Sequence, residues 1–283
     1  MVTIMNYGMR CHDICPKADI DTVLDTVKAN QINQIQLALG KSISGYDFNY
    51  GHYSPGFGRA IGQKLKEREI HVAVLGCYIN PVNPDENMRQ AEIRKFIEHL
   101  KYAKAIGADM VGTETGRYSA AFDVVPYTYT EGCYQLLLKS MREIVSAAEK
   151  LGVIVGVEGV HDHTLYCPEI MRRFLEDIDS PNVEVILDPV NLISAENHQN
   201  QDQVIDNAFK LYSDRISVIH LKDFVMKNGE PKFAHVGTGL LHYETVMRNL
   251  KAQKPYIAML LENSNTQRYH SDVAYLQKIY DEA

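Results

Sequence analysis

Residues 152–165 read GVIVGVEGVHDHTL. In the first half of this stretch glycine alternates with β-branched residues, as in a strand that is buried on both faces. The run then ends abruptly in a carboxylate and two imidazoles, Glu158, His161 and His163. The preceding segment, GCYQLLLKSMREIVSAAEKL, has apolar residues at helical spacing and stops at Gly152, where a helix C-cap is expected. The stretch therefore predicts a helix, a buried strand and a polar strand tip.

The same alternation of strand-like and helix-like segments recurs along the whole chain. Short β-rich runs alternate with longer amphipathic segments, and the runs cover residues 7–11, 34–39, 71–77, 110–114, 153–158, 183–188, 216–222 and 257–262. Strict alternation indicates parallel βαβ units, and eight of them most simply close into a (β/α)₈ TIM barrel, α/β in class, with a single domain over residues 1–283. An open doubly wound sheet is the alternative topology. No GxGxxG motif follows the first run, so its dinucleotide-binding form lacks its signature.

Composition narrows the classes of function. The 283 residues are 45% hydrophobic and 23% charged, with a formal net charge of −7. An acidic chain is a poor partner for nucleic acid or for an anionic membrane surface. No apolar stretch approaches a bilayer span, the first residues lack the features of a signal peptide, and the five cysteines form no CxxC pair. We expect a cytoplasmic protein without disulfides.

Four predicted strands end in residues that can bind a metal. Period two places Glu158 at the tip of an inward-facing row, and three later runs end in Asp188, His220 and Glu262. Successive intervals of 30, 32 and 42 residues are each close to one βα repeat, so the four side chains are expected at one height on the barrel axis. Three carboxylates and one imidazole cannot all stay unpaired in a pocket of low dielectric. A divalent cation would resolve this, and the ligand set suits Mn²⁺, Co²⁺, Mg²⁺ or Zn²⁺.

Four motifs give the chain a family resemblance. They are GVEGVHDH (156–163), VILDPVNL (185–192), VIHLKDF (218–224) and the tail HVGTGLLHYETVMRNLKAQKPYIAMLLENSN (235–265). In this order and spacing the chain resembles the sugar isomerase/epimerase-like TIM barrels, related to xylose isomerase and endonuclease IV. The resemblance implies that Glu158, Asp188, His220 and Glu262 bind one metal ion, with Mn²⁺ expected first. It also implies that Glu158 and Glu262 form the acid/base pair.

The implied reaction is a proton transfer beside a carbonyl group. The metal would polarise the carbonyl and stabilise an enediolate, while one glutamate removes a proton and the other returns it. This predicts a metal-dependent isomerase or epimerase acting on a small-molecule sugar or sugar phosphate. A metal-dependent dehydratase resembling inosose dehydratase, or a hydrolase, is the alternative within the same fold. A non-catalytic sugar-binding barrel is less favoured.

One departure from the family pattern argues against a nuclease. Many relatives, including the nuclease branch, have histidine three residues after the aspartate, whereas this chain has Asn191. An amide is a poor metal ligand but can bind a substrate hydroxyl. We therefore expect no nucleic-acid partner. Oligomerisation is common in the family, but nothing in the sequence identifies an interface.

Further side chains near strand ends are candidates for substrate binding: His161, Asn191, Lys222, Glu114, His12 and Arg117. Several have structural alternatives. His161 can simply bind a backbone carbonyl, Lys222 can pair with a carboxylate, and Glu114 can pair with Arg117.

Other polar residues are expected to be structural. Asp223 should point away from the pocket and cap a loop, and the loop residues 225–241 should be irregular, like residues 40–54 and 116–126. Gly237 and Gly239 should serve the backbone of a turn. Several histidines in polar, helix-like contexts are expected on the surface: His52, His99, His198, His242 and His270.

Overall fold

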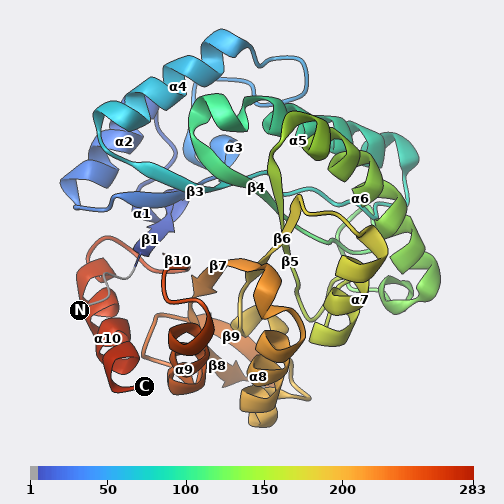
Figure 1. Cartoon of the computed structure of the whole chain (residues 1–283), viewed down its shortest axis with the longest axis vertical. Helices are drawn as coiled ribbons and strands as arrows, with labels where there is room; N and C mark the ends of the chain where they lie inside the picture. Colours follow the sequence, from blue (N-terminus) through green and yellow to red (C-terminus); the bar gives the residue numbers. More distant parts are fainter. Residues whose placement is uncertain (1–5) are drawn as a thin grey trace.

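In the computed structural model, which describes residues 6–283, a closed barrel of parallel strands forms the centre of the molecule (Figure 1). Around the barrel the strands follow the order β1-β10-β7-β6-β5-β4-β3-β2. Their bounds are β1 Asn6–Arg10, β2 Gln34–Leu37, β3 His71–Gly76, β4 Ala108–Glu114, β5 Ile154–Glu158, β6 Val183–Leu187, β7 Ile216–Leu221 and β10 Ala258–Leu261. The predicted (β/α)₈ barrel is confirmed, and each strand lies within two residues of its predicted run.

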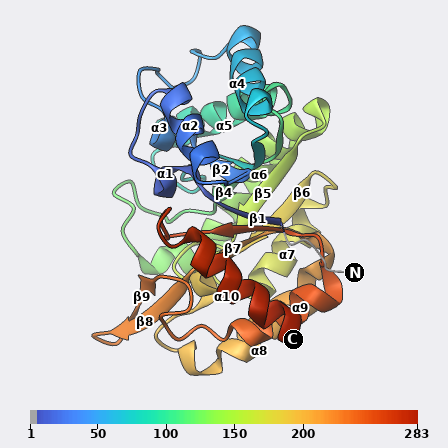
Figure 2. The same ribbon diagram turned by 90° about the vertical axis from the view of Figure 1, so that its left-hand side faces the viewer.

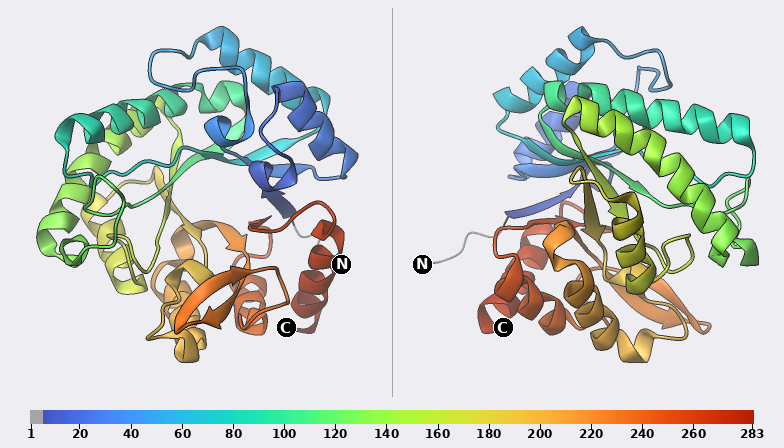
Figure 3. Two further views of the ribbon diagram at one scale, coloured as in Figure 1. Left: turned by 180° about the vertical axis from the view of Figure 1, so that it is seen from behind. Right: turned by 45° about the vertical axis from the view of Figure 1, so that its right-hand side comes forward.

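Helices surround the barrel on the outside (Figure 1). They are α1 Cys11–Ile14, α2 Ile20–Ala29, α3 Leu39–Ser42, α4 Pro55–Glu67, α5 Glu86–Ile106, α6 Glu131–Leu151, α7 Pro168–Ile178, α8 Gln201–Tyr212, α9 Tyr243–Gln253 and α10 Tyr269–Glu282. The long helices α5 and α6 lie side by side along one wall (Figure 3). Both end as predicted at left-handed glycines, Gly107 with φ 86° and Gly152 with φ 62°. Within residues 6–283, no helix has the length and apolar character needed to span a membrane.

The alternating glycine of β5 has a packing reason. A small cluster inside the barrel contains Met110 and Ile186, on the strands that flank β5. A Cβ added at Gly156 would lie 2.5 Å from the sulfur of Met110 and 2.9 Å from Cδ1 of Ile186. Glycine at this inward position therefore lets larger side chains fill the barrel beneath Glu158.

A hairpin replaces one of the predicted irregular loops. The segments β8 Asp223–Lys227 and β9 Glu230–Ala234 pair in antiparallel fashion, and Figure 2 shows them projecting from the end of the barrel where α1 and α3 also lie. Asn228 and Gly229 join them with positive φ angles of 56° and 81°. The expectation for residues 225–241 was wrong in this part, because an Asn-Gly pair favours a two-residue hairpin turn.

One of the five histidines expected on the surface lies in the interior. His99 is 3% exposed on α5, where its Nδ1 lies 2.9 Å from the carbonyl oxygen of Lys95 and its Nε2 lies 3.2 Å from the hydroxyl of Tyr53. The carbonyl can only accept, so Nδ1 carries the proton and Nε2 accepts from the tyrosine. Burial lowers the pKa of His99 to about 4. The prediction failed because the segment after β2 folds back over this face of α5.

Candidate metal centre

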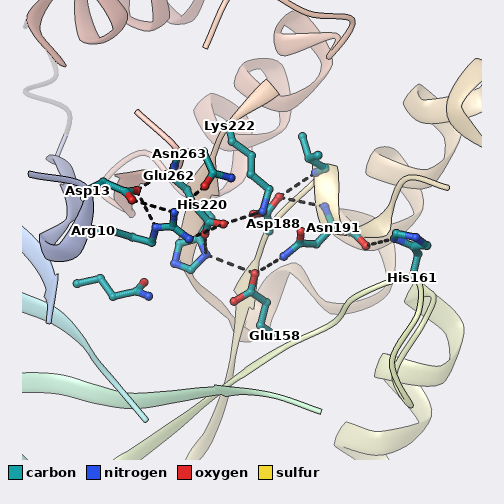
Figure 4. Close-up of polar contacts among 12 residues, drawn as sticks. Arg10, Asp13, Glu158, His161, Asp188, Asn191, His220, Lys222, Glu262 and Asn263 are labelled. Atoms are coloured by element: carbon teal, nitrogen blue, oxygen red, sulfur yellow. Dashed lines mark hydrogen bonds and ion pairs between the residues drawn. The ribbon is translucent and has the colours of Figure 1, made fainter. Parts of the chain in front are cut away.

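The carboxy-terminal strand tips bring the four predicted ligands together (Figure 4). Glu158 ends β5, Asp188 follows β6, His220 lies on β7 and Glu262 follows β10. One ligand atom from each lies within 4.8 Å of the others, and the residues are between 0% and 7% exposed. This group could hold a metal ion.

The orientation of His220 fits a metal ligand. Its Nδ1 lies 3.4 Å from Oε1 of Glu158 and 3.2 Å from Oε2 of Glu262, yet neither contact has the angle of a hydrogen bond, and both ring nitrogens lack a hydrogen-bond partner within residues 6–283. Burial lowers the pKa of His220, but the two carboxylates outweigh this and raise it to about 10. A buried imidazole nitrogen aimed between two carboxylates is the arrangement that a divalent cation satisfies.

Lys222 lies against the same carboxylates. Its Nζ is 2.8 Å from Oδ2 of Asp188 and 2.8 Å from Oε1 of Glu262, and the residue is 1% exposed. The contact with Glu262 is a hydrogen bond, whereas the one with Asp188 is an ion pair without hydrogen-bond alignment. Of the two predicted roles for Lys222, the structure shows the pairing with carboxylates. Contact with substrate stays a prediction.

Arg10 was missing from the predicted set. Its guanidinium lies 2.8 Å from Glu262 and 2.8 Å from Asp13, and it donates to the side chain of Asn263 at 2.8 Å. Burial raises the pKa of Glu262, but Lys222, His220 and Arg10 together hold it well below the usual range. The available signal was that Arg10 is the last but one residue of the first predicted run, residues 7–11.

Glu158 has different neighbours from Glu262. Asn191 donates from Nδ2 to Oε1 of Glu158 at 2.7 Å, and the backbone N–H of Asn191 donates to Oδ1 of Asp188 at 3.1 Å. Asn191 therefore contacts two of the candidate ligands. His161 lies beside it, with Nδ1 3.3 Å from the backbone oxygen of Asn191. This is the structural alternative predicted for His161, and its imidazole stays partly exposed.

Glu114 and Arg117 do not pair with each other as the sequence alternative proposed. Arg117 binds Asp162 at 2.5 Å, and Glu114 faces the buried His163 at 3.7 Å. Burial raises the pKa of Glu114 to about 7, with Glu158 adding to the effect through charge repulsion. The same burial lowers the pKa of His163 to about 4. Glu114 therefore has a half-buried carboxyl group beside the candidate ligands that can exist in either protonation state near neutrality.

The half of the barrel formed by β1 to β3 contributes further polar groups. His12, on α1, is partly buried, and its Nδ1 has no hydrogen-bond partner within residues 6–283. Tyr78, after β3, contacts the amide of the buried Gln36. Burial raises the pKa of Tyr78, with Glu158 and Glu262 adding to it. Sequence reasoning did not select Gln36 or Tyr78 as site residues, although both stand near the ends of predicted strands.

A hollow at the other end of the barrel is not the candidate site. It has a volume of about 490 Å³ and is lined by residues at the starts of strands, such as Asn6, Gln34 and His71. It contains none of the four candidate ligands. Active sites of (β/α)₈ barrels lie at the carboxy-terminal face.

Fold and side chains thus define a (β/α)₈ barrel with a buried group of metal-ligand type at its mouth. The chain belongs to the xylose isomerase-like TIM barrel family, whose model matches residues 24–279. Among curated proteins, inosose dehydratase from Histophilus somni (strain 129Pt) is 26% identical over 144 residues, which are 49% of this chain and 47% of that protein. The match spans about half of the length of that relative.

Several solved structures share the fold over nearly the whole chain. The 3-keto-D-glucoside 4-epimerase YcjR from E. coli has a TM-score of 0.74 at 15% identity, covering 97% of this chain and 100% of that one. A D-tagatose 3-epimerase-like protein has a TM-score of 0.75 at 17% identity, with coverages of 98% and 99%. The IOLI protein with a binding zinc atom has a TM-score of 0.71 at 14% identity, with coverages of 98% and 96%. At these identities the likeness shows the fold.

Proposed function

We propose that this protein is a divalent-metal-dependent isomerase or epimerase of a small sugar or polyol-derived ketone. The observation that supports it is the pair of buried glutamates within one metal-ligating group, on β5 and after β10, with β6 and β7 between them in the barrel. Two carboxylates that approach one point from different strands can serve opposite faces of a substrate, as proton removal and return require. The known sugar epimerases of this fold agree with the proposal.

The different surroundings of Glu158 and Glu262 suggest different roles in proton transfer. Among residues 6–283, Glu158 has one amide donor and no cation of lysine or arginine at ion-pair distance, so we assign it the removal of the proton from the carbon beside the carbonyl. Glu262, between Arg10 and Lys222, is the second proton-transfer group. A bound divalent ion, for which we expect Mn²⁺, would act as the Lewis acid that polarises the carbonyl.

Deuterium uptake tests the proposal. The enzyme is incubated in D₂O with a panel of free and phosphorylated ketoses, aldoses and inosose-like ketones, in Mn²⁺ or in EDTA, and products are weighed by mass spectrometry. We expect metal-dependent uptake of deuterium into one substrate class with an otherwise unchanged molecular formula. Uptake followed by loss of water would instead assign a dehydratase, the activity named for the curated relative. No uptake in any compound would contradict the proposal.

Matched variants locate the chemistry. Glu158→Gln and Glu262→Gln are each expected to lower exchange by at least about a hundredfold, since a general acid/base group contributes roughly 10²- to 10⁴-fold. Glu184→Gln is the control, because this glutamate near the start of β6 bonds to Ser217 and contributes nothing to the candidate ligand group. Near-native exchange in either of the first two variants would refute the two-base assignment.

A further inference from the structure

The β8–β9 hairpin places an exposed aromatic ring against the candidate site. Phe233 is 61% exposed, yet its ring centroid lies 4.3 Å from Nζ of Lys222. That same Nζ lies 2.8 Å from carboxylate oxygens of both Asp188 and Glu262. The ring of Phe233 therefore contacts the buried Lys222, which pairs with two of the candidate ligands, and is also open to solvent. Large exposed apolar groups beside a polar site commonly serve binding.

The base of the hairpin places the backbone of Phe233. Phe233 pairs with Phe224, which is 0% exposed, and the neighbouring pair joins Asp223 with Ala234. As predicted, Asp223 caps the loop that follows: its carboxylate accepts from the backbone N–H groups of Gly239 at 2.8 Å and Leu241 at 2.9 Å. The backbone of Phe233 is thus one residue pair from this anchor, so little backbone freedom is lost when the ring binds a ligand.

The distances say which part of a ligand this ring can contact. A ligand ring that stacks on the open side of Phe233 lies roughly 4 Å beyond it, at van der Waals separation. With Nζ of Lys222 4.3 Å away on the other side, the stacked ring would be about 8 Å from the lysine that touches two of the candidate ligands. That ring is too far away to be the one whose C–H bond reacts.

We propose that Phe233 is the platform of a second subsite, which binds a ring attached to the reacting sugar. This inference rests on the proposed sugar chemistry and narrows its substrates to glycosides and similar two-ring compounds, in preference to free monosaccharides. The physical basis is the stacking of an apolar or aromatic ring face on phenylalanine. Phe233 determines specificity here and takes no part in proton transfer.

The test measures binding without turnover. The full-length protein loaded with Mg²⁺, a diamagnetic ion, is titrated with 4-nitrophenyl β-D-glucopyranoside and with methyl β-D-glucopyranoside, and saturation-transfer NMR records the contacts of each ring. In the wild type we expect strong transfer to the nitrophenyl protons and a lower Kd for this compound. Phe233→Ala should weaken its binding about threefold to tenfold, the range for one aromatic contact, and leave the methyl glucoside unchanged.

Three more variants separate a platform from a hydrophobic cover over Lys222. Phe233→Tyr keeps a flat ring and should bind like the wild type, whereas Phe233→Leu keeps only the cover and should bind like Phe233→Ala. Val225→Ala is the control, since this residue is 37% exposed on the same hairpin. The inference is overturned if the wild type binds the two glucosides equally or binds neither, or if Phe233→Leu retains the preference. Failure of the proposed function would show instead as absent deuterium uptake in the wild type.

Discussion

Replacing Lys222 by methionine tests the electrostatics of the site directly. The change removes one positive charge and keeps an unbranched apolar stem in a position that is 1% exposed. Lys222 belongs to a closely packed charged group of four carboxylates and two cations: Glu158, Asp188, Glu262, Asp13, Arg10 and Lys222. Binding a metal requires His220 to be neutral, and with His220 neutral this group carries two net negative charges, which one divalent ion would neutralise.

The expected magnitude follows from burial. Breaking a buried ion pair by removing one partner costs about 3–5 kcal/mol, because the other charge stays buried and unpaired. In a chain of this size 1 kcal/mol corresponds to roughly 2–4 °C in Tm, so Lys222→Met should lose about 6–20 °C in the absence of metal. A bound divalent ion pairs with the same carboxylates and should restore roughly half of the lost free energy. By linkage the variant then binds the ion about tenfold to a hundredfold more tightly than the wild type.

The assay combines thermal unfolding with calorimetry. Tm is measured by circular dichroism in EDTA and in saturating Mn²⁺, and the Kd for Mn²⁺ is measured by titration calorimetry. Lys232→Met is the matched control, because its ion pair with Glu230 is exposed and such pairs contribute about 0–1 kcal/mol. Equal Tm values for Lys222→Met and the wild type in EDTA would refute the neutralising role of Lys222. An equal loss of Tm with and without Mn²⁺, at unchanged Kd, would show that the ion does not bind these carboxylates.

Three further predictions address separate parts of the molecule. Asn191→Leu removes the 2.7 Å hydrogen bond to Glu158 and should lower the exchange rate about 10- to 100-fold, the range for groups that orient ligands; an unchanged rate would exclude a positioning role. Because the pKa of His99 is lowered to about 4, its contribution to the free energy of unfolding is fully present above about pH 6.5. As the pH falls towards 4, at most about 3 kcal/mol of this contribution is lost. Urea unfolding across this range should show a shallower decline in His99→Phe, and parallel curves would contradict the assignment. Gly239→Ala would bring Cβ to 2.2 Å from a backbone oxygen and should cost about 1–3 kcal/mol, whereas Gly40→Ala, with nothing within 4 Å, should not; similar urea midpoints for the two variants would refute the packing argument.

Much of the fold could be predicted because its signals are local. The period of two in each β-rich run and of 3.6 in each helix can be read from a few neighbouring residues, and C-cap glycines such as Gly107 mark their ends. The hairpin was missed although its Asn-Gly turn is a local signal. The burial of His99 had no such signal, because it depends on a loop that contacts α5 from another part of the chain.

What the sequence determined by itself was the barrel and the common height of Glu158, Asp188, His220 and Glu262, since equal repeats place equal positions at equal heights. Only the tertiary structure decided what surrounds them. Arg10 reaches Asn263, 253 residues away in sequence, because β1 pairs with β10 when the barrel closes. Likewise Phe233, on β9, lies over Lys222 because β9 pairs with β8, the strand that directly follows Lys222. Charge neutralisation and stacking act through space at a few ångströms, so they depend on which segments the closed barrel brings together, and no spacing along the chain encodes that.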